Sequence, residues 1–162
     1  MNIRLNPQLL AEVSAFLWLE ADMLDHAEFS DWLDLWTEDG LYIVPIDPEE
    51  SDLENTLNYA YDNGVMRQKR VARLTSGESI STQPPSRLVR SLSRFRILSD
   101  DGKIVTLRAA QNLREFRKET LRLYTSDITF EVARVEGGFK LHRKIVRLIN
   151  STDVLQGIGF IL

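Results

Sequence analysis

The sequence predicts an α+β domain in which N-terminal helices pack inside a curved antiparallel sheet. Apolar residues recur at helical spacing in the first part of the chain, and long runs with strand-like alternation fill the second half. Helices followed by an antiparallel sheet give the element order of an α+β fold, and a sheet curved around one helix is cone-shaped. The chain has 162 residues, and we expect one domain over residues 1–162.

The first helix is expected to run from Pro7 to about Asp25. Asn6 suits the N-cap position, Pro7 is favoured at the first helical position, and apolar residues then recur at helical spacing. Glu20 falls on the apolar face of this helix, where an unpaired carboxylate would be costly. We therefore expect Glu20 to have a partner.

A second helix and a strand are expected next. Ser30 suits the N-cap of this helix, and Gly40 suits a left-handed position at its end. Leu41–Val44 then has the composition of a strand. Pro45–Glu54 contains two prolines and five acidic residues, which predicts an exposed loop.

Two further short segments are defined by their apolar patterns. Leu57–Tyr61 alternates apolar and polar residues, and Asp62 could cap a short helix that reaches Leu74. The tail Ile158–Leu162 is apolar and would promote association if exposed. We expect this tail to pack beneath the sheet or into a subunit contact.

Long strands are expected after the two prolines at 84 and 85. The first two form a hairpin around the turn that ends at Gly102. The third changes its apolar face near Thr125, from Leu121 and Leu123 to Ile128, which predicts a bulge and a bend. The expected strands are Arg87–Leu98, Lys103–Phe116, Thr120–Arg134 and Phe139–Ile149.

Charge is distributed unevenly along the chain. Residues 1–62 hold one basic and fifteen acidic residues, a net charge of −14, whereas residues 63–162 hold nineteen basic and nine acidic residues, a net charge of +10. The two halves should attract each other, either within one fold or between copies of the chain. Nucleic acid is not an expected partner, because the basic half shows no regular aromatic stacking pattern.

Composition limits the chemistry and the location of the chain. There are no cysteines and two histidines, which excludes disulfides, thiolate metal sites and a cysteine nucleophile. The apolar stretch Leu9–Leu24 is interrupted by three acidic residues and lacks a basic leader, so neither secretion nor a membrane span is expected. We expect a cytoplasmic protein without a membrane partner.

The motif RVARL is followed shortly by PPSR, and further motifs are spread over nearly the whole chain. Together they resemble the small, or beta, subunit of Rieske-type aromatic-ring-hydroxylating dioxygenases. The most specific part is RVARL followed shortly by PPSR. The chain departs from the family pattern at Arg67, Gln68 and Lys69, in the helix after YAYDN. The other matching elements are Glu20, Ala21, Leu24, Asp25, WLDLW, Tyr42, Pro45, YAYDN and RKIVRL.

The resemblance implies a cone-shaped fold like those of cystatin and nuclear transport factor two. It also implies a large catalytic subunit as partner, which would carry the Rieske 2Fe-2S cluster and a mononuclear iron and form a cis-dihydrodiol from an aromatic compound. The small subunit would form a homotrimeric base, with a ferredoxin or reductase supplying electrons indirectly. No catalytic residue, cofactor or metal site is expected in this chain. The absence of cysteine agrees independently, since a Rieske cluster needs thiolate ligands.

The candidate structural or interface residues surround the PPSR motif and the buried face of the first helix. Two prolines stiffen the backbone ahead of Arg87, which favours a forked contact with a carboxylate. We hypothesise that Arg87 and Arg90 meet a neighbouring subunit, or else Glu20, Asp25 or Asp62 of the same chain. The full candidate set is Glu20, Asp25, Asp62, Pro84, Pro85, Ser86, Arg87 and Arg90.

An alternative function belongs to a different class. Cone folds also host stand-alone isomerases, dehydratases and hydrolases with a pocket of acid and base residues. The groups available for such a site are Asp22, His26, Tyr42, Tyr59 and His142. An iron site of His26, His142 and Asp22 or Asp25 is formally possible, but the cationic neighbours of His142 oppose a bound cation.

Overall fold

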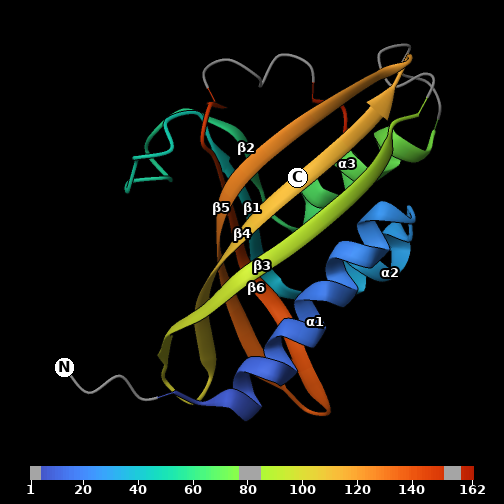
Figure 1. Ribbon diagram of the computed structural model, residues 1–162. Coiled ribbons are helices and arrows are strands. Elements are labelled where there is room, and N and C mark those ends of the chain that lie inside the picture. The colour runs from blue at the N-terminus through green and yellow to red at the C-terminus, as the bar shows by residue number, and fades with distance from the viewer. Residues whose placement is uncertain (1–4, 77–84, 152–157) are drawn as a thin grey trace.

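A computed structural model describes residues 5–76, 85–151 and 158–162 (Figure 1). Within them, a six-stranded sheet of order β2-β1-β6-β5-β4-β3 curves around helix α1. Helix α1 packs against β3, and helix α3 packs against β1 and β2. The elements are α1 Pro7–Asp25, α2 Phe29–Asp34, β1 Trp36–Pro45, β2 Asn58–Asp62, α3 Gly64–Thr75, β3 Arg87–Asp100, β4 Ile104–Arg117, β5 Thr120–Val135 and β6 Gly138–Leu148.

Helix α1 follows its predicted pattern from cap to core. The Asn6 side chain accepts a hydrogen bond from the backbone N–H of Leu9 at 3.1 Å, and Pro7 occupies the first turn. This bond satisfies one of the N–H groups that a helix start leaves without an intrahelical partner. The apolar stripe of Leu9, Val13, Leu17 and Leu24 is buried against the sheet.

Helix α2 is shorter than predicted, and the predicted caps at Ser30 and Gly40 are wrong. Glu28 is the N-cap, Ser30 lies inside the helix, and β1 already begins at Trp36. Trp36 pairs with β6, so its backbone hydrogen bonds belong to the sheet. Gly40 lies within β1, where a Cβ atom would come 2.8 Å from Cε3 of Trp36. The glycine therefore permits a close approach to an aromatic ring instead of ending a helix.

The capping residue of α3 and one strand pairing also differ from expectation. Asn63, not Asp62, caps α3, with its side chain accepting from the N–H of Met66 at 3.0 Å. Asp62 ends β2 and is buried. Strand β1 pairs with β6 in parallel, while every other pairing of the described sheet is antiparallel.

The bulge predicted near Thr125 is absent. Strands β4 and β5 pair without interruption from Arg117↔Thr120 to Ile104↔Ala133. Because this continuous ladder keeps the two-residue period, Leu121 and Leu123 point to the outer face and are 66% and 55% exposed. The irregularity of β5 lies instead against β6, between Glu131 and Val132.

The core lies between the helices and the inner face of the sheet. The apolar tail enters it, with Ile158, Phe160, Ile161 and Leu162 all buried in the main cluster. The tail therefore packs beneath the sheet, the first of the two expected places. None of the helices in the described residues is long and apolar enough to cross a membrane.

Candidate functional site

A buried ion pair joins the first helix to the last strand. Lys144 Nζ of β6 lies 2.8 Å from Glu20 Oε1 of α1, and Trp32 Nε1 of α2 donates to the same oxygen at 2.9 Å. Both charged side chains are at most 1% exposed. Burial lowers the pKa of Lys144, and the Glu20 carboxylate opposes that shift. Glu20 thus has the partner that its position on the apolar face requires.

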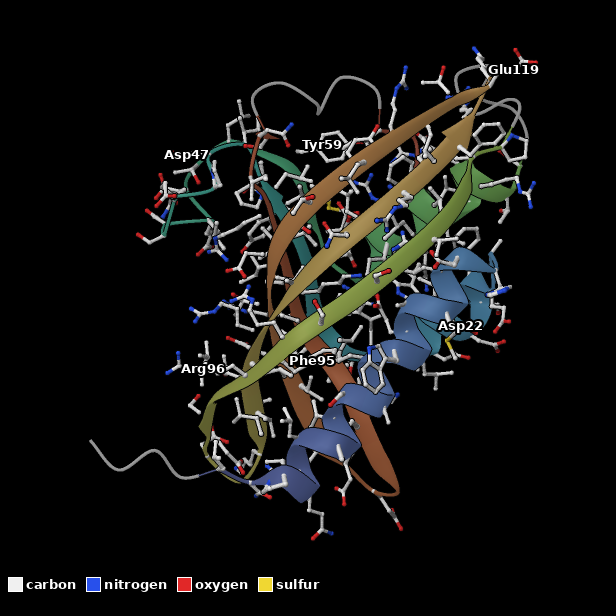
Figure 2. All side chains as sticks on the ribbon, in the orientation of Figure 1. Asp22, Asp47, Tyr59, Phe95, Arg96 and Glu119 are labelled. Carbon is white, nitrogen blue, oxygen red and sulfur yellow. The ribbon has the colours of Figure 1, made fainter. Side chains whose placement is uncertain are left out.

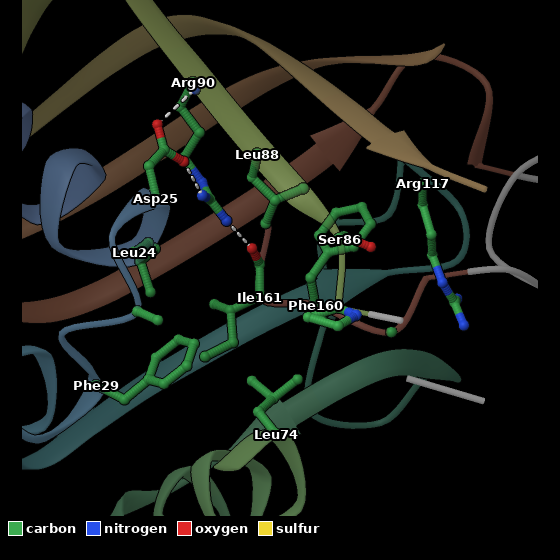
Figure 3. A pocket seen from close by; sticks show the side chains of 13 residues that line it. Leu24, Asp25, Phe29, Leu74, Ser86, Leu88, Arg90, Arg117, Phe160 and Ile161 are labelled. Atoms are coloured by element: carbon green, nitrogen blue, oxygen red, sulfur yellow. Dashed lines mark hydrogen bonds and ion pairs between the residues drawn. The ribbon is translucent and has the colours of Figure 1, made fainter. Parts of the chain in front are cut away.

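A second pair fastens the PPSR strand and the tail to helix α1. The Arg90 backbone N–H donates to Asp25 Oδ2 at 2.7 Å, and its guanidinium pairs with the other oxygen of Asp25 (Figure 3). The guanidinium also donates to the carbonyl of Ile161. Arg90 thus meets Asp25 of its own chain, the within-chain alternative, and the forked contact ties three separate segments together.

Two arginines of α3 hold this helix to the sheet. Arg70 Nε lies 2.5 Å from Asp62 Oδ2. Arg67, one of the departures from the family pattern, is buried, with its guanidinium carbon 4.1 Å from the centre of the Trp36 ring. It donates to the carbonyls of Gly40 and Asp62. Burial lowers the pKa of Arg67 to about 10, and its partners belong to the same chain.

The two tyrosines of the alternative acid/base pocket, Tyr42 and Tyr59, form hydrogen bonds with the tail instead. Tyr59 Oη donates to the carbonyl of Ile158 at 2.5 Å, and the Leu162 N–H donates to Tyr42 Oη at 2.9 Å. Tyr42 is fully buried, and burial raises the pKa of its hydroxyl. Both hydroxyls therefore anchor the tail and are poorly placed to exchange protons with a substrate.

A cavity of about 160 Å³ remains beside the tail (Figure 3). Asp25 and Arg90 line it and pair with each other, and Ser86 and Arg117 are the other polar side chains in its lining. Its apolar lining comes from Leu24, Phe29, Leu74, Leu88, Phe160 and Ile161.

The structure does not bring the predicted acid/base residues together. Asp22 and His26 lie at the exposed end of α1, where the Asp22 carbonyl and carboxylate raise the pKa of His26. His142 Nδ1 instead faces Thr37 Oγ1 at 3.2 Å on another part of the fold. Across the described residues, no group of three histidine, cysteine or acidic side chains is arranged to hold a metal ion.

The residues of the PPSR motif differ in exposure: Ser86 is half-buried, whereas Pro85 and Arg87 are exposed. Pro84 lies outside the described residues, and Pro85 is exposed beside the cavity. Ser86 Oγ donates to the buried carboxylate of Glu115 at 2.5 Å. Arg87 is exposed, and its side chain forms no ion pair with another described residue.

Sequence reasoning missed a cluster on the outer face of the sheet. In one row of the ladder Arg87 pairs with Phe116 and Phe116 with Leu121, and in the next row Val89 pairs with Arg114 and Arg114 with Leu123. All six side chains are exposed. The change of apolar face near Thr125 was the available signal, interpreted above as a bulge. We call this cluster the outer grid: Arg87, Val89, Arg114, Phe116, Leu121 and Leu123.

Lys144 was also missed as a core residue, although its position carries a signal. It lies two and four residues before Val146 and Leu148, so all three share the inner face of β6. A lysine in phase with buried apolar residues indicates a buried acidic partner, and here that partner is Glu20.

Comparison with known proteins gives one consistent family. Residues 19–154 match the family model described as "Ring hydroxylating beta subunit". The small oxygenase component of the p-cumate 2,3-dioxygenase system of Pseudomonas putida is 28% identical, over 83% of this chain and 76% of that protein. The beta subunit of benzene 1,2-dioxygenase from Pseudomonas putida is 30% identical, over 95% of this chain and 89% of that protein.

Solved structures confirm the predicted fold. A chain of naphthalene 1,2-dioxygenase with indole bound in the active site superposes with a TM-score of 0.84 at 18% identity, over 98% of this chain and 88% of that one. An NTF2-like protein with a cystatin-like fold from Novosphingobium aromaticivorans gives a TM-score of 0.59 at 14% identity, over 86% of this chain and 81% of that one. The cone-shaped α+β fold is therefore shared with both.

Proposed function

Because this chain belongs to the family of ring-hydroxylating dioxygenase beta subunits, we propose that it is the small, non-catalytic subunit of a Rieske non-haem iron dioxygenase. Its large partner subunit converts an aromatic compound to a cis-dihydrodiol. This chain contributes contacts and shape that support assembly of the large subunits. The expected location of the assembly is the cytoplasm.

The observation that carries this proposal is that the chain's own tail packs inside the cone, with a cavity of about 160 Å³ beside it. Tyr42 and Tyr59 bind the backbone of the tail, and Arg90 binds Asp25 and Ile161. The interior groups that could act on a substrate are thereby committed to holding the fold. A protein so organised works through its surface.

The residues of this chain do not fit the metal centres of such an enzyme. A Rieske centre takes two thiolates and two imidazoles, and the sequence contains no cysteine. Its two histidines lie on separate elements, His26 after α1 and His142 in β6. We therefore assign the 2Fe-2S cluster and the mononuclear iron to the large subunit, which receives electrons from a ferredoxin or a reductase.

The assembly that we propose has a threefold base made of three copies of this chain. Such a base would hold the large subunits in register around one axis, as a closed cyclic oligomer does. The opposite charges of the two halves of the chain support association between copies.

Co-purification tests this function. An affinity tag on this chain, co-expressed with a large dioxygenase subunit from the same organism, should recover both chains in equal amounts. Iron should follow the large chain when the two are separated. Recovery of this chain alone, or iron bound stoichiometrically to the isolated folded chain, would contradict the proposal.

A further inference from the structure

We infer that the outer grid docks onto the acidic loop between β1 and β2 of a second copy of this chain. The acidic loop is the segment 46–57, which joins the two strands at one edge of the sheet. The inference rests on the homotrimeric base proposed above and names the two surfaces that form it.

The outer grid is an apolar surface of a kind that a folded monomer rarely keeps. Val89, Phe116, Leu121 and Leu123 are 62%, 45%, 66% and 55% exposed and lie in two adjacent rows across three strands. The next row is polar, since Thr125 Oγ1 donates to the Asn112 side chain at 2.8 Å. The apolar area is therefore confined to one end of the sheet, as expected of a contact surface.

The charge of the grid selects an acidic partner. Arg87 and Arg114 lie within it, and neither is paired with a described carboxylate. An apolar surface crossed by free arginines favours a partner that presents carboxylates around an apolar residue.

The acidic loop presents that chemistry on the same chain. None of its five carboxylates pairs with a cation among the residues that the structure describes. Leu57, at the end of the loop, is 77% exposed. The carboxylates belong to Asp47, Glu49, Glu50, Asp52 and Glu54.

The placement of the two surfaces requires a head-to-tail contact. Strand β2, beside the loop, is one edge of the sheet and β3, which carries Arg87 and Val89, is the other. In Figure 2, Asp47 of the loop and Glu119 at the tip of the β4–β5 hairpin lie on opposite sides of the molecule. A contact between two different surfaces of identical chains is heterologous and closes into a ring when the rotation allows it. The grid and the loop therefore suit a cyclic trimer.

Charge reversal on each surface tests the contact, with the mass of the isolated chain in solution as the measurement. The double variant Arg87→Glu, Arg114→Glu places carboxylates opposite the acidic loop, and Glu49→Lys, Glu54→Lys places lysines opposite the grid. The side chains of Glu49 and Glu54 make no hydrogen bond within the described structure, so the loop conformation should survive. Each variant should weaken association of the wild-type trimer by about a hundredfold or more.

All four substitutions in one chain should restore the trimer, because every contact again joins opposite charges. An equimolar mixture of the two double variants should give pairs but no closed ring of three, since an odd ring cannot alternate two kinds of chain. Leu98→Glu is the matched control: Leu98 is also an exposed leucine of the sheet, at 45%, but lies toward the other end of β3. This control should leave the mass unchanged.

Three results would overturn the inference: a monomeric wild-type chain at all accessible concentrations, a grid variant that remains trimeric, or a fourfold variant that stays monomeric although its melting curve is native. A grid variant that trimerises but fails to bind the large subunit would assign the grid to that subunit instead. Failure of the proposed function is recognised separately, because there the wild-type chain captures no large subunit whatever its own mass.

Discussion

The inside of the cone buries charged residues, whereas the outer grid exposes apolar residues, and both placements are unusual for a folded protein. Inside, charged side chains are buried and each has a partner in the same chain; outside, apolar side chains are exposed on adjacent strands. The buried pairs hold the fold together, whereas the exposed apolar side chains form a surface of the kind that contacts another chain. The buried charged residues are Glu20, Asp62, Arg67, Arg90, Glu115 and Lys144.

The largest effect is expected from breaking the buried pair. Lys144→Met leaves the Glu20 carboxylate buried without its cation, which should lower the free energy of unfolding by about 3–5 kcal/mol. Urea unfolding monitored by circular dichroism measures the change. Adding Glu20→Gln removes the stranded charge and keeps an oxygen for Trp32 Nε1, so the double variant should recover most of the loss. Equal stability of the single variant and the wild type would mean that the inside does not depend on this pair.

A smaller loss of stability is expected from truncating a buried side chain of the tail. Ile161 is 1% exposed, so Ile161→Ala should lower the free energy of unfolding by about 2–4 kcal/mol. Ile149 is 70% exposed, and Ile149→Ala should change it by less than about 0.5 kcal/mol. Matching losses in the two variants would show that the tail is not part of the core.

A pH effect is expected at the β3–β4 turn. Arg134 and the Gly102 N–H hold the pKa of Asp100 at about 2, below its ordinary value of 3.8. Because this pKa is depressed by folding, the resulting stabilisation is present above pH 4 and is lost as the pH falls toward 2. Arg134→Gln should move the Asp100 pKa back toward 3.8 in an NMR titration of the carboxyl group. An unmoved titration would contradict the assigned cause.

The smallest effect on stability is expected from the outer grid. Leu123→Ser removes an apolar side chain that is 55% exposed, so the melting temperature of the chain at concentrations where it is monomeric should barely change. The same variant should associate less, because the lost surface belongs to the contact. A large drop in monomer stability would show that Leu123 serves the fold and would remove the contrast between the two regions.

Local patterns were sufficient to predict most helices and strands. The cap at Asn6, the apolar stripe of α1 and the β3–β4 hairpin depend on neighbouring residues, and all three were predicted. Gly40 misled the prediction because glycine suits both a helix end and a close approach to a ring, and only the position of Trp36 decides between them.

Long-range pairings could not be predicted from one sequence. Glu20 required a partner, but Lys144 lies 124 residues away, and the parallel pairing of β1 with β6 leaves no local trace. The bulge near Thr125 was predicted wrongly because Leu121 and Leu123 were assumed to face inward. The apolar pattern of a strand is normally interpreted as burial within its own chain. Apolar residues that contact another chain therefore resemble irregularities in the strand.

Reconstitution with the large subunit is the most direct measurement of the central claim. The large subunit is purified alone, and its sedimentation mass and turnover of an aromatic substrate are recorded before and after this chain is added. We expect a complex of defined mass and higher turnover, with no iron moving to this chain. An unchanged mass and turnover, or turnover by this chain alone, would contradict the account.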